Sequence, residues 1–181
     1  MYLYWSFPFQ DCTQGFITLT YMKANLITQA GKDALQEELD YLWRIKRPEV
    51  TQAVSEAAAL GDRSENAEYK EGKRELRGID RRVRFLRKRL EVLKVVEYSP
   101  QQEGKAWFGA WVELENEAGE VLRCRIVGTD EIDTRKGHIT IDSPMARAVL
   151  GKQEDDEVLV STPTGDKLWF IIRIQYQPFS S

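Results

Sequence analysis

The fold of this chain is decided by residues 65–95, ENAEYKEGKRELRGIDRRVRFLRKRLEVLKV. The apolar residues of this stretch alternate by three and four positions, at Leu76, Ile79, Val83, Leu86, Leu90 and Leu93. That spacing puts one narrow apolar stripe on a single face of an α-helix, and in a two-helix coiled coil the stripe is the seam against a partner. The stretch therefore predicts a long helix that needs a second helix to pack against.

The partner is predicted over residues 28–60, where apolar residues recur at helical spacing in two runs, Leu35, Leu39, Leu42 and then Val50, Ala53, Ala57, Leu60. The step between the runs is eight residues, one more than a heptad, and Pro48 lies inside it. Because proline removes one helical hydrogen bond, we expect a kink or a register change near Arg47 and Pro48.

The two predicted helices are joined by a short turn over Gly61 to Asn66. Helices joined so tightly must run antiparallel, each burying its stripe on the other. About thirty residues at ~1.5 Å per residue make a rod of roughly 45 Å, longer than the core of a small domain is wide. We expect the turn to form a tip far from the rest of the protein.

After Glu97 the pattern changes from helical to alternating, and Ser99 to Gln102 are predicted to be a linker. A hairpin is predicted around Asn116 to Gly119, with one apolar face formed by Val112, Leu114, Leu122, Cys124 and Ile126. On the opposite face, Glu113 and Glu115 can pair with Arg123 and Arg125 across the strands.

The C-terminal region is completed by a strand over 138–142, a short helix and a last hairpin over 157–161 and 167–176. Ser143 is the predicted cap of the helix, Pro144 its first residue and Gly151 its end. The predicted fold class is α+β, with a long antiparallel helical hairpin followed by a small antiparallel sheet domain with a short helix.

Composition excludes several classes of protein. The 181 residues are 42% apolar and 30% charged, which fits one or two small domains. The start of the chain lacks the basic region of a signal peptide, and no transmembrane stretch follows. Cys12 and Cys124 have no second cysteine or histidine at ligand spacing, so neither a disulfide framework nor a structural zinc site is predicted. We expect a cytoplasmic protein.

Residues 1–21 carry seven aromatic side chains without a clear period and precede Met22-Lys23, which resembles a natural start. We expect them to be a non-native or disordered extension, because chain ends are commonly poorly ordered. The alternative is a sticky amphipathic arm that docks elsewhere. The predicted organisation is this extension, a coiled coil over 22–98 with an acidic tip at 61–66, and a sheet domain over 99–181.

Charge is unevenly distributed along the chain. Eleven Lys or Arg face four acids between Lys70 and Lys94, whereas nine face fourteen from Tyr98 to Ser181. The residues of one helical stripe are Lys70, Arg74, Arg77, Arg81, Arg84 and Lys88. Such a stripe is commonly just a solvated outer face. Because few acids are placed to neutralise it, the stripe also suits phosphate binding and the guidance of a nucleic-acid end towards the tip.

The tip offers two carboxylates, Asp62 and Glu65, three residues apart. The simpler interpretation is a helix start, with an acid at the cap and Glu three residues later. The functional interpretation is that both carboxylates, at the end of a rod, jointly hold a hard cation or a water bound to it. A cap needs no rod, so the position of the pair favours the second interpretation.

Several separated segments, in order, resemble the GreA/GreB family of bacterial transcript-cleavage factors, with closer likeness to its GreB branch. The segments are residues 37–42, 47–50, 61–69, 108–110, 125–128, 130–131 and 142–147, within a match from Met22 to Tyr176. The likeness to the GreB branch is carried by residues 41–44, 61–66 and 98–104.

The resemblance implies a coiled coil that enters the secondary channel of RNA polymerase and an FKBP-like C-terminal domain that grips the channel rim. It implies that Asp62 and Glu65 help to retain the second magnesium of the polymerase and orient a water on backtracked RNA, with Ser64 and Asn66 supporting the tip. Asp142, Ser143 and Pro144 match the rim-binding loop. The implied protein is a monomeric accessory factor without a cofactor of its own, whose partners are RNA polymerase and the nascent RNA 3′ end, not a membrane.

Three other functions compete. A regulator that enters the channel without cleaving is the main alternative, although plugging regulators usually carry a zinc-finger cysteine set and cleavage-dead relatives change the tip acids. A prolyl isomerase is suggested only by the implied FKBP-like fold, and a fold does not confer an activity. A self-sufficient nuclease would need more ligands than two carboxylates, so we expect no cleavage without the polymerase.

Overall fold

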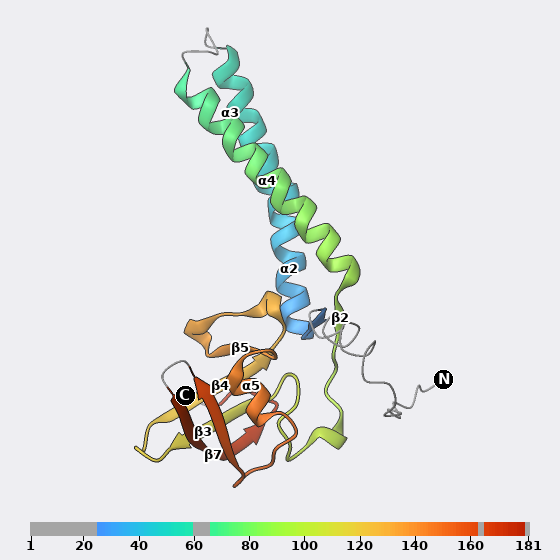
Figure 1. The fold of residues 1–181 in the computed structure, drawn as a ribbon. Helices are drawn as coiled ribbons and strands as arrows, with labels where there is room; N and C mark the ends of the chain where they lie inside the picture. The colour runs from blue at the N-terminus through green and yellow to red at the C-terminus, as the bar shows by residue number, and fades with distance from the viewer. Residues whose placement is uncertain (1–24, 60–65, 163–164, 180–181) are drawn as a thin grey trace, which may run out of the picture.

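The computed structural model describes residues 25–59, 66–162 and 165–179. Within them, a long helical hairpin rises from one side of a curled sheet domain, as Figure 1 shows. The first arm consists of α2 (Gln29–Tyr41), the π-helical turn η1 (Leu42–Lys46) and α3 (Arg47–Ala59), and the returning arm is α4 (Ala67–Val92). The α+β class and the antiparallel helical hairpin predicted from the sequence are confirmed. Residues 1–21, about which an extension was predicted, lie outside the described residues.

The seam of the hairpin follows the predicted apolar stripe. Leu35 of α2 packs with Leu86 and Leu93 near the base, and Val50 of α3 packs with Ile79 and Val83 towards the tip. Leu39 and Leu42 contact both clusters, so the two form a continuous seam. Since apolar burial stabilises by roughly 25 cal/mol per Å², this seam is the main reason that the rod is ordered so far from the sheet.

The predicted register change near Pro48 takes the form of a π-helical turn at Leu42–Lys46. The N–H of Arg47 donates to the carbonyl of Leu42, five residues back, so the turn contains one residue more than an α-helical turn. That extra residue absorbs the eight-residue step between Leu42 and Val50 and returns Val50 to the seam. Pro48 follows immediately as the second residue of α3, and its missing N–H and its ring interrupt the regular α-helical hydrogen bonds at the point where the register changes.

Two short parallel strands hold the base of the hairpin together. In β1 (Leu26–Ile27) and β2 (Lys94–Val95), Leu26 is opposite Lys94 and Ile27 is opposite Val95. Ile27 of β1 is fully buried and packs in one cluster with Leu35, Leu86 and Leu93 of the hairpin. This pair of strands is not predictable from the sequence, because two residues are too few to show an alternating pattern.

The C-terminal domain is a five-stranded sheet in the order β5, β4, β3, β7, β6. Its strands are β3 (Trp111–Asn116), β4 (Val121–Val127), β5 (His138–Thr140), β6 (Glu157–Thr162) and β7 (Gly165–Gln175). Both predicted hairpins are antiparallel, β3 with β4 and β6 with β7. Among the described strands, β5 is the exception to the predicted antiparallel sheet, because it pairs with β4 in parallel.

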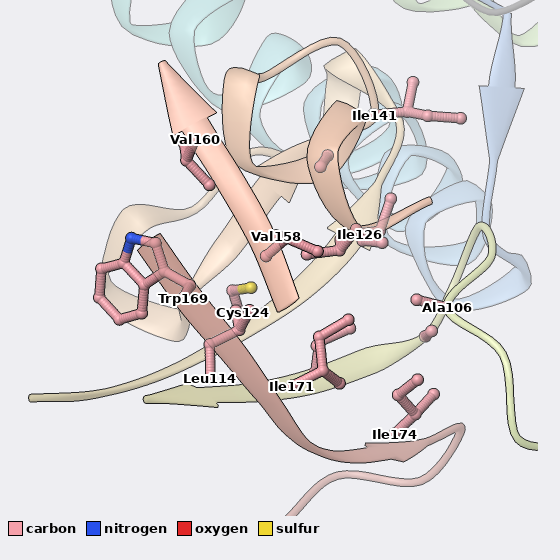
Figure 2. Packing of buried hydrophobic residues seen from close by; sticks show 14 of the residues in the cluster. Ala106, Leu114, Cys124, Ile126, Ile141, Val158, Val160, Trp169, Ile171 and Ile174 are labelled. Carbon is pink, nitrogen blue, oxygen red and sulfur yellow. The ribbon is translucent and has the colours of Figure 1, made fainter. Parts of the chain in front are cut away.

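The short helix α5 (Pro144–Val149) packs over one face of the sheet and encloses the core shown in Figure 2. Ala146 and Val149 of the helix are fully buried, as are Leu114, Ile126 and Ile171 of the strands. The predicted inner face of the first hairpin is correct for four of its five members, whereas Leu122 is 37% exposed at the strand end. Short 3₁₀ turns complete the connections, η2 (Pro100–Gln102) in the predicted linker, η3 (Thr129–Glu131) and η4 (Thr134–Lys136). No helix among the described residues is long and apolar enough to span a membrane.

Candidate functional site

The tip of the hairpin is closed by Asn66. Its side-chain oxygen accepts a hydrogen bond from the N–H of Tyr69 at 2.9 Å and so caps α4, while its amide donates to the carbonyl of Ala57 at 2.8 Å. One side chain thus ties the end of α3 to the start of α4. Asp62, Ser64 and Glu65 lie outside the described residues. Because Asn66 caps α4, the helix-cap interpretation of Asp62 and Glu65 is wrong as an account of where this helix begins.

The predicted stripe, Lys70, Arg74, Arg77, Arg81, Arg84 and Lys88, is exposed along its whole length on α4. Its charges differ from those on the opposite flank of the same helix. There, Arg82 makes two hydrogen bonds of 2.7 Å with Glu38, and Glu75 pairs with Lys46 at 3.0 Å. On the stripe, only Arg74 has a carboxylate partner among the described residues, Glu71 at 3.7 Å, and both side chains are more than 70% exposed. The stripe therefore keeps most of its positive charge.

Two hollows lie along the stripe. The first, about 280 Å³ in volume, is lined by Arg74, Arg77, Asp80, Arg81 and Arg84. The second, about 480 Å³, is lined by Trp43, Arg47, Asp80, Val83, Arg84, Arg87 and Lys88. They share Asp80 and Arg84 and so form one track. Asp80 is paired with Arg47 at 2.9 Å, which leaves the track with a surplus of cations.

A polar joint fixes the hairpin on the sheet domain. The carboxylate of Glu131 accepts hydrogen bonds from the N–H of Thr28 at 2.9 Å, from the N–H of Gly128 at 3.2 Å and from the Thr28 hydroxyl. Beside it, Arg89 pairs with Asp130 at 2.8 Å, with side chains only 20% and 14% exposed, and donates to Asn25 at 2.8 Å. Charged groups so far from water are expensive to leave unpaired, so the joint favours one orientation of the rod.

The loop of Asp142, Ser143 and Pro144 starts α5 at the surface. The hydroxyl of Ser143 accepts from the N–H of Ala146 at 3.1 Å, which confirms the predicted cap, and Pro144 is exposed. Asp142 is 3.8 Å from Arg147, a loose pair that leaves the carboxylate accessible. The helix start accounts for both Ser143, as its cap, and Pro144, as its first residue, whereas the partly exposed Asp142 makes only the loose pair with Arg147 among the described residues.

Comparison with known proteins decides the family. A family model described as "Transcription elongation factor, N-terminal" matches residues 25–95, and one described as "Transcription elongation factor, GreA/GreB, C-term" matches residues 101–176. The chain belongs to the GreA/GreB family. The resemblance inferred from the sequence is thereby confirmed.

Among Gre relatives, transcription elongation factor GreB of Pseudomonas syringae pv. tomato is 62% identical over 156 residues, which cover 86% of this chain and 99% of the relative. GreB of Vibrio cholerae is 65% identical over 157 residues, covering 86% of this chain and 98% of the relative. Among solved structures, the GreA factor homolog 1 of Thermus thermophilus is 27% identical, covers 83% of this chain and 97% of that one, and has a TM-score of 0.38. The chain is a Gre-type transcription elongation factor.

Sequence reasoning missed two groups in this Gre chain. Asp130 and Glu131 form one of the segments that resemble the family, but their sequence does not predict that they hold the joint between the hairpin and the sheet. The single available signal is the pair of adjacent acids that follows Gly128 and Thr129, without a basic neighbour in the same turn. Trp43 belongs to a segment that resembles the GreB branch, and the signal that could have singled it out is an aromatic residue inside a basic region.

Proposed function

We propose that this protein stimulates the cleavage of backtracked nascent RNA by RNA polymerase, reaching the polymerase active site through the secondary channel. The observation that carries the proposal is the rod itself. Helix α4 has 26 residues, which at ~1.5 Å each span roughly 40 Å and hold its cap, Asn66, well away from the sheet domain. Such a rod delivers a few side chains into a narrow, deep site.

Asp62 and Glu65 are the proposed catalytic side chains of the turn. Their carboxylate oxygens are the ligand atoms that magnesium prefers. Magnesium is coordinated by six ligands, so two carboxylates leave most of its coordination positions to waters or to other groups. The pair therefore suits a magnesium ion shared with the polymerase, which would activate water and stabilise charge on the phosphate. In this proposal the two carboxylates orient that water, and Ser64 and Asn66 support the turn.

The protein acts as an accessory factor and not as a nuclease of its own. The remaining catalytic groups belong to the polymerase, so we expect no RNA cleavage when the polymerase is absent. The sheet domain binds the rim of the channel through Asp142, Ser143 and Pro144. The basic stripe receives the displaced RNA 3′ end, because unpaired cations along a helix attract phosphates over a distance set by the salt concentration.

The test is cleavage of labelled RNA in a halted, backtracked elongation complex, with and without the full chain. We expect rapid shortening of the RNA with the wild type and a loss of at least about tenfold in rate with Asp62→Ala or Glu65→Ala. Glu68→Ala is the matched control. Glu68 is an exposed acid in the first turn of α4, so this substitution removes one negative charge outside the 61–66 turn. Its rate should stay within about twofold of the wild type.

Binding must be measured in the same experiment. The Asp62 and Glu65 variants should compete with the wild type for polymerase at nearly unchanged concentration, because two carboxylates at the tip contribute little to the docking surface. If the wild type binds polymerase but does not shorten the RNA, the protein is the non-cleaving channel regulator. Full cleavage by both single variants at limiting magnesium would remove the carboxylates from the mechanism.

A further inference from the structure

Trp43 lies on the surface of the hairpin in an unusual setting. It belongs to the π-helical turn η1, its residue is 43% exposed, and it joins neither apolar cluster of the seam, although its neighbour Leu42 joins both. π-Helical turns recur at functional sites, where they redirect side chains that a regular helix would place elsewhere. Seam packing explains Leu42 but does not explain an indole at the next position.

The indole is bordered by guanidinium groups. The Cζ atom of Arg87 is 4.4 Å from the ring centroid and that of Arg47 is 5.1 Å from it. These three residues line the hollow of about 480 Å³ together with Asp80, Val83, Arg84 and Lys88. Cation–π attraction of this kind holds the guanidinium groups over the face of the ring, so a base that stacks on the same face must displace one of them.

The charge balance of the hollow favours an anionic ligand. Arg47 is compensated by Asp80 at 2.9 Å. Arg84, Arg87 and Lys88 form no salt bridge with any residue of the described ranges 25–59, 66–162 and 165–179. A site for single-stranded nucleic acid combines cations, which hold the phosphates, with an aromatic ring, which stacks on a base. The three uncompensated cations and the exposed ring of Trp43 supply both.

The hollow is continuous with the rest of the basic stripe. Through Asp80 and Arg84 it joins the first hollow, of about 280 Å³, which reaches Arg74 in the direction of the tip. Thirteen residues separate Arg74 from Arg87, so at ~1.5 Å per residue the track is roughly 20 Å long. A duplex keeps its base faces inside the stack, whereas a single strand exposes them, so an indole on this track discriminates in favour of an unpaired strand.

We propose that Trp43 is a stacking platform for one unpaired RNA base, with Arg84, Arg87 and Lys88 holding the phosphates beside it. The base stacks on the indole, and Arg87 turns its guanidinium from the ring to the backbone of the strand. This site deepens the proposed function, since it identifies where on the rod the displaced RNA is held. It is measurable without polymerase, so it can fail or hold independently of the cleavage activity.

The experiment compares two labelled strands that carry equal charge, an oligouridylate of twelve nucleotides and an abasic strand of twelve sugar phosphates. Their affinity for the full chain is measured by fluorescence anisotropy at low salt. We expect the wild type to bind the oligouridylate about tenfold more tightly than the abasic strand, because stacking on one aromatic side chain is worth about that factor. Trp43→Ala should erase this difference, and Trp43→Phe should keep part of it.

Two controls separate stacking from charge and from folding. Trp107→Phe changes a tryptophan of the sheet domain that is 41% exposed, close to the exposure of Trp43, and should leave both affinities unchanged. The double variant Arg84→Glu, Lys88→Glu should weaken both strands together. Oligouridylate should also quench the tryptophan fluorescence of the wild type and of Trp107→Phe, but not that of Trp43→Phe. Helicity and Tm of each variant are measured alongside.

Several results would overturn the platform. Equal affinity of the wild type for the two strands would exclude a base contact, and equal weakening of both strands by Trp43→Ala would show that the residue acts on folding or charge. Retention of the difference in Trp43→Leu would indicate apolar packing instead of stacking. A Trp43→Ala protein that competes poorly for polymerase, with unchanged RNA affinity, would assign the hollow to a protein surface. If the base-dependent affinity holds while cleavage fails, the cleavage proposal falls and the platform stands.

Discussion

At the scale of single residues, Asn66 makes the contact that closes the tip, because one amide serves both helices. Replacing Asn66 with Ala leaves the N–H of Tyr69 and the carbonyl of Ala57 without these partners. We expect a loss of about 1–2 kcal/mol in the free energy of unfolding, as for other helix caps. Denaturant unfolding followed by circular dichroism measures this loss.

The variant Asn66→Asp separates the cap from the bridge. It keeps an acceptor for Tyr69 and adds a charge that suits the helix N-terminus, but it cannot donate to the Ala57 carbonyl. We expect near-normal stability with weaker cleavage stimulation. If Asn66→Asp is as active as the wild type, the bridge to α3 contributes nothing to the position of the tip.

The buried thiol of Cys124 should make the stability of the protein depend on pH. Burial in the core of the sheet domain raises the pKa of its thiol to about 12. The thiol of the unfolded chain ionises from about pH 8.5, so the folded state gains stability from the neutral thiol below that pH and loses it as the pH rises towards the folded pKa.

The measurement uses a Cys12→Ser protein, which leaves Cys124 as the single thiol. We expect almost no reaction with a thiol reagent at pH 9 in the native state and rapid reaction in denaturant, since the thiolate is the reactive form. Replacing Cys124 with Ala should flatten the fall in stability on the alkaline side. Fast native labelling at pH 9 would contradict the burial argument.

At the scale of elements, two glycines that look alike in the sequence differ in their surroundings. A Cβ on Gly128 would lie 2.0 Å from the carbonyl oxygen of Leu26, where backbone must move, whereas one on Gly78 in α4 would meet nothing within 4 Å. We expect Gly78→Ala to stabilise by about 0.5–1 kcal/mol, the ordinary gain in a helix interior, and Gly128→Ala to destabilise by more than that.

Thermal melts of both variants test this pair. For a chain of this length, each kcal/mol shifts Tm by about 2–4 °C. The expected shifts therefore have opposite signs, a small rise for Gly78→Ala and a clear fall for Gly128→Ala. A fall for both would mean that α4 needs flexibility at Gly78 that the packing does not reveal.

Elements in which the apolar pattern repeats many times were predictable from the sequence. Short elements, and those that form the joint, were not. The six seam residues from Leu76 to Leu93 predict a helix because their spacing repeats over several turns. The extra residue between Leu42 and Val50 predicts a change of register. Its π-helical form could not be derived, since a kink would absorb the same residue. The parallel pairing of β5 with β4 escaped prediction because a three-residue strand carries no information about direction.

The candidate site shows the same division. The stripe on α4 was predicted in full, because helix geometry alone fixes which charges share a flank. That Arg82 and Glu75 have partners while the stripe mostly lacks them depends on pairing between α4 and the first arm, which spacing does not determine. The Trp43 hollow needed the π-helical turn to exist, so it became visible only in three dimensions.

At the scale of the whole molecule, we expect the joint and the loop at Asp142 to affect two different properties, the direction of the rod and the affinity for the polymerase. The joint sets where the tip points relative to the sheet domain, because Glu131 and Arg89 bind across the two parts. The loop affects how tightly the protein is held to its proposed site on the channel rim. Added protein should restore cleavage when a variant binds too weakly, but not when its rod points in the wrong direction.

Replacing Glu131 with Ala leaves two backbone N–H groups and the Thr28 hydroxyl without this acceptor. Each unsatisfied buried donor costs about 1–3 kcal/mol, so we expect the loss of this acceptor to lower the free energy of unfolding by at least about 3 kcal/mol and Tm by about 6–12 °C. The rod then samples other directions. Cleavage should be reduced even at saturating protein, because a bound factor with a misdirected tip still occupies the polymerase.

Replacing Asp142 with Ala should do the opposite. The carboxylate has only a loose pair with Arg147 at 3.8 Å, so its loss costs little stability. We expect the protein concentration for half-maximal cleavage to rise about tenfold while the maximal rate is unchanged. Titrating both variants into a backtracked complex, below their Tm, separates the two effects. If excess Glu131→Ala protein restores the full rate, the joint only stabilises the fold, and the direction of the rod is set by the polymerase channel instead.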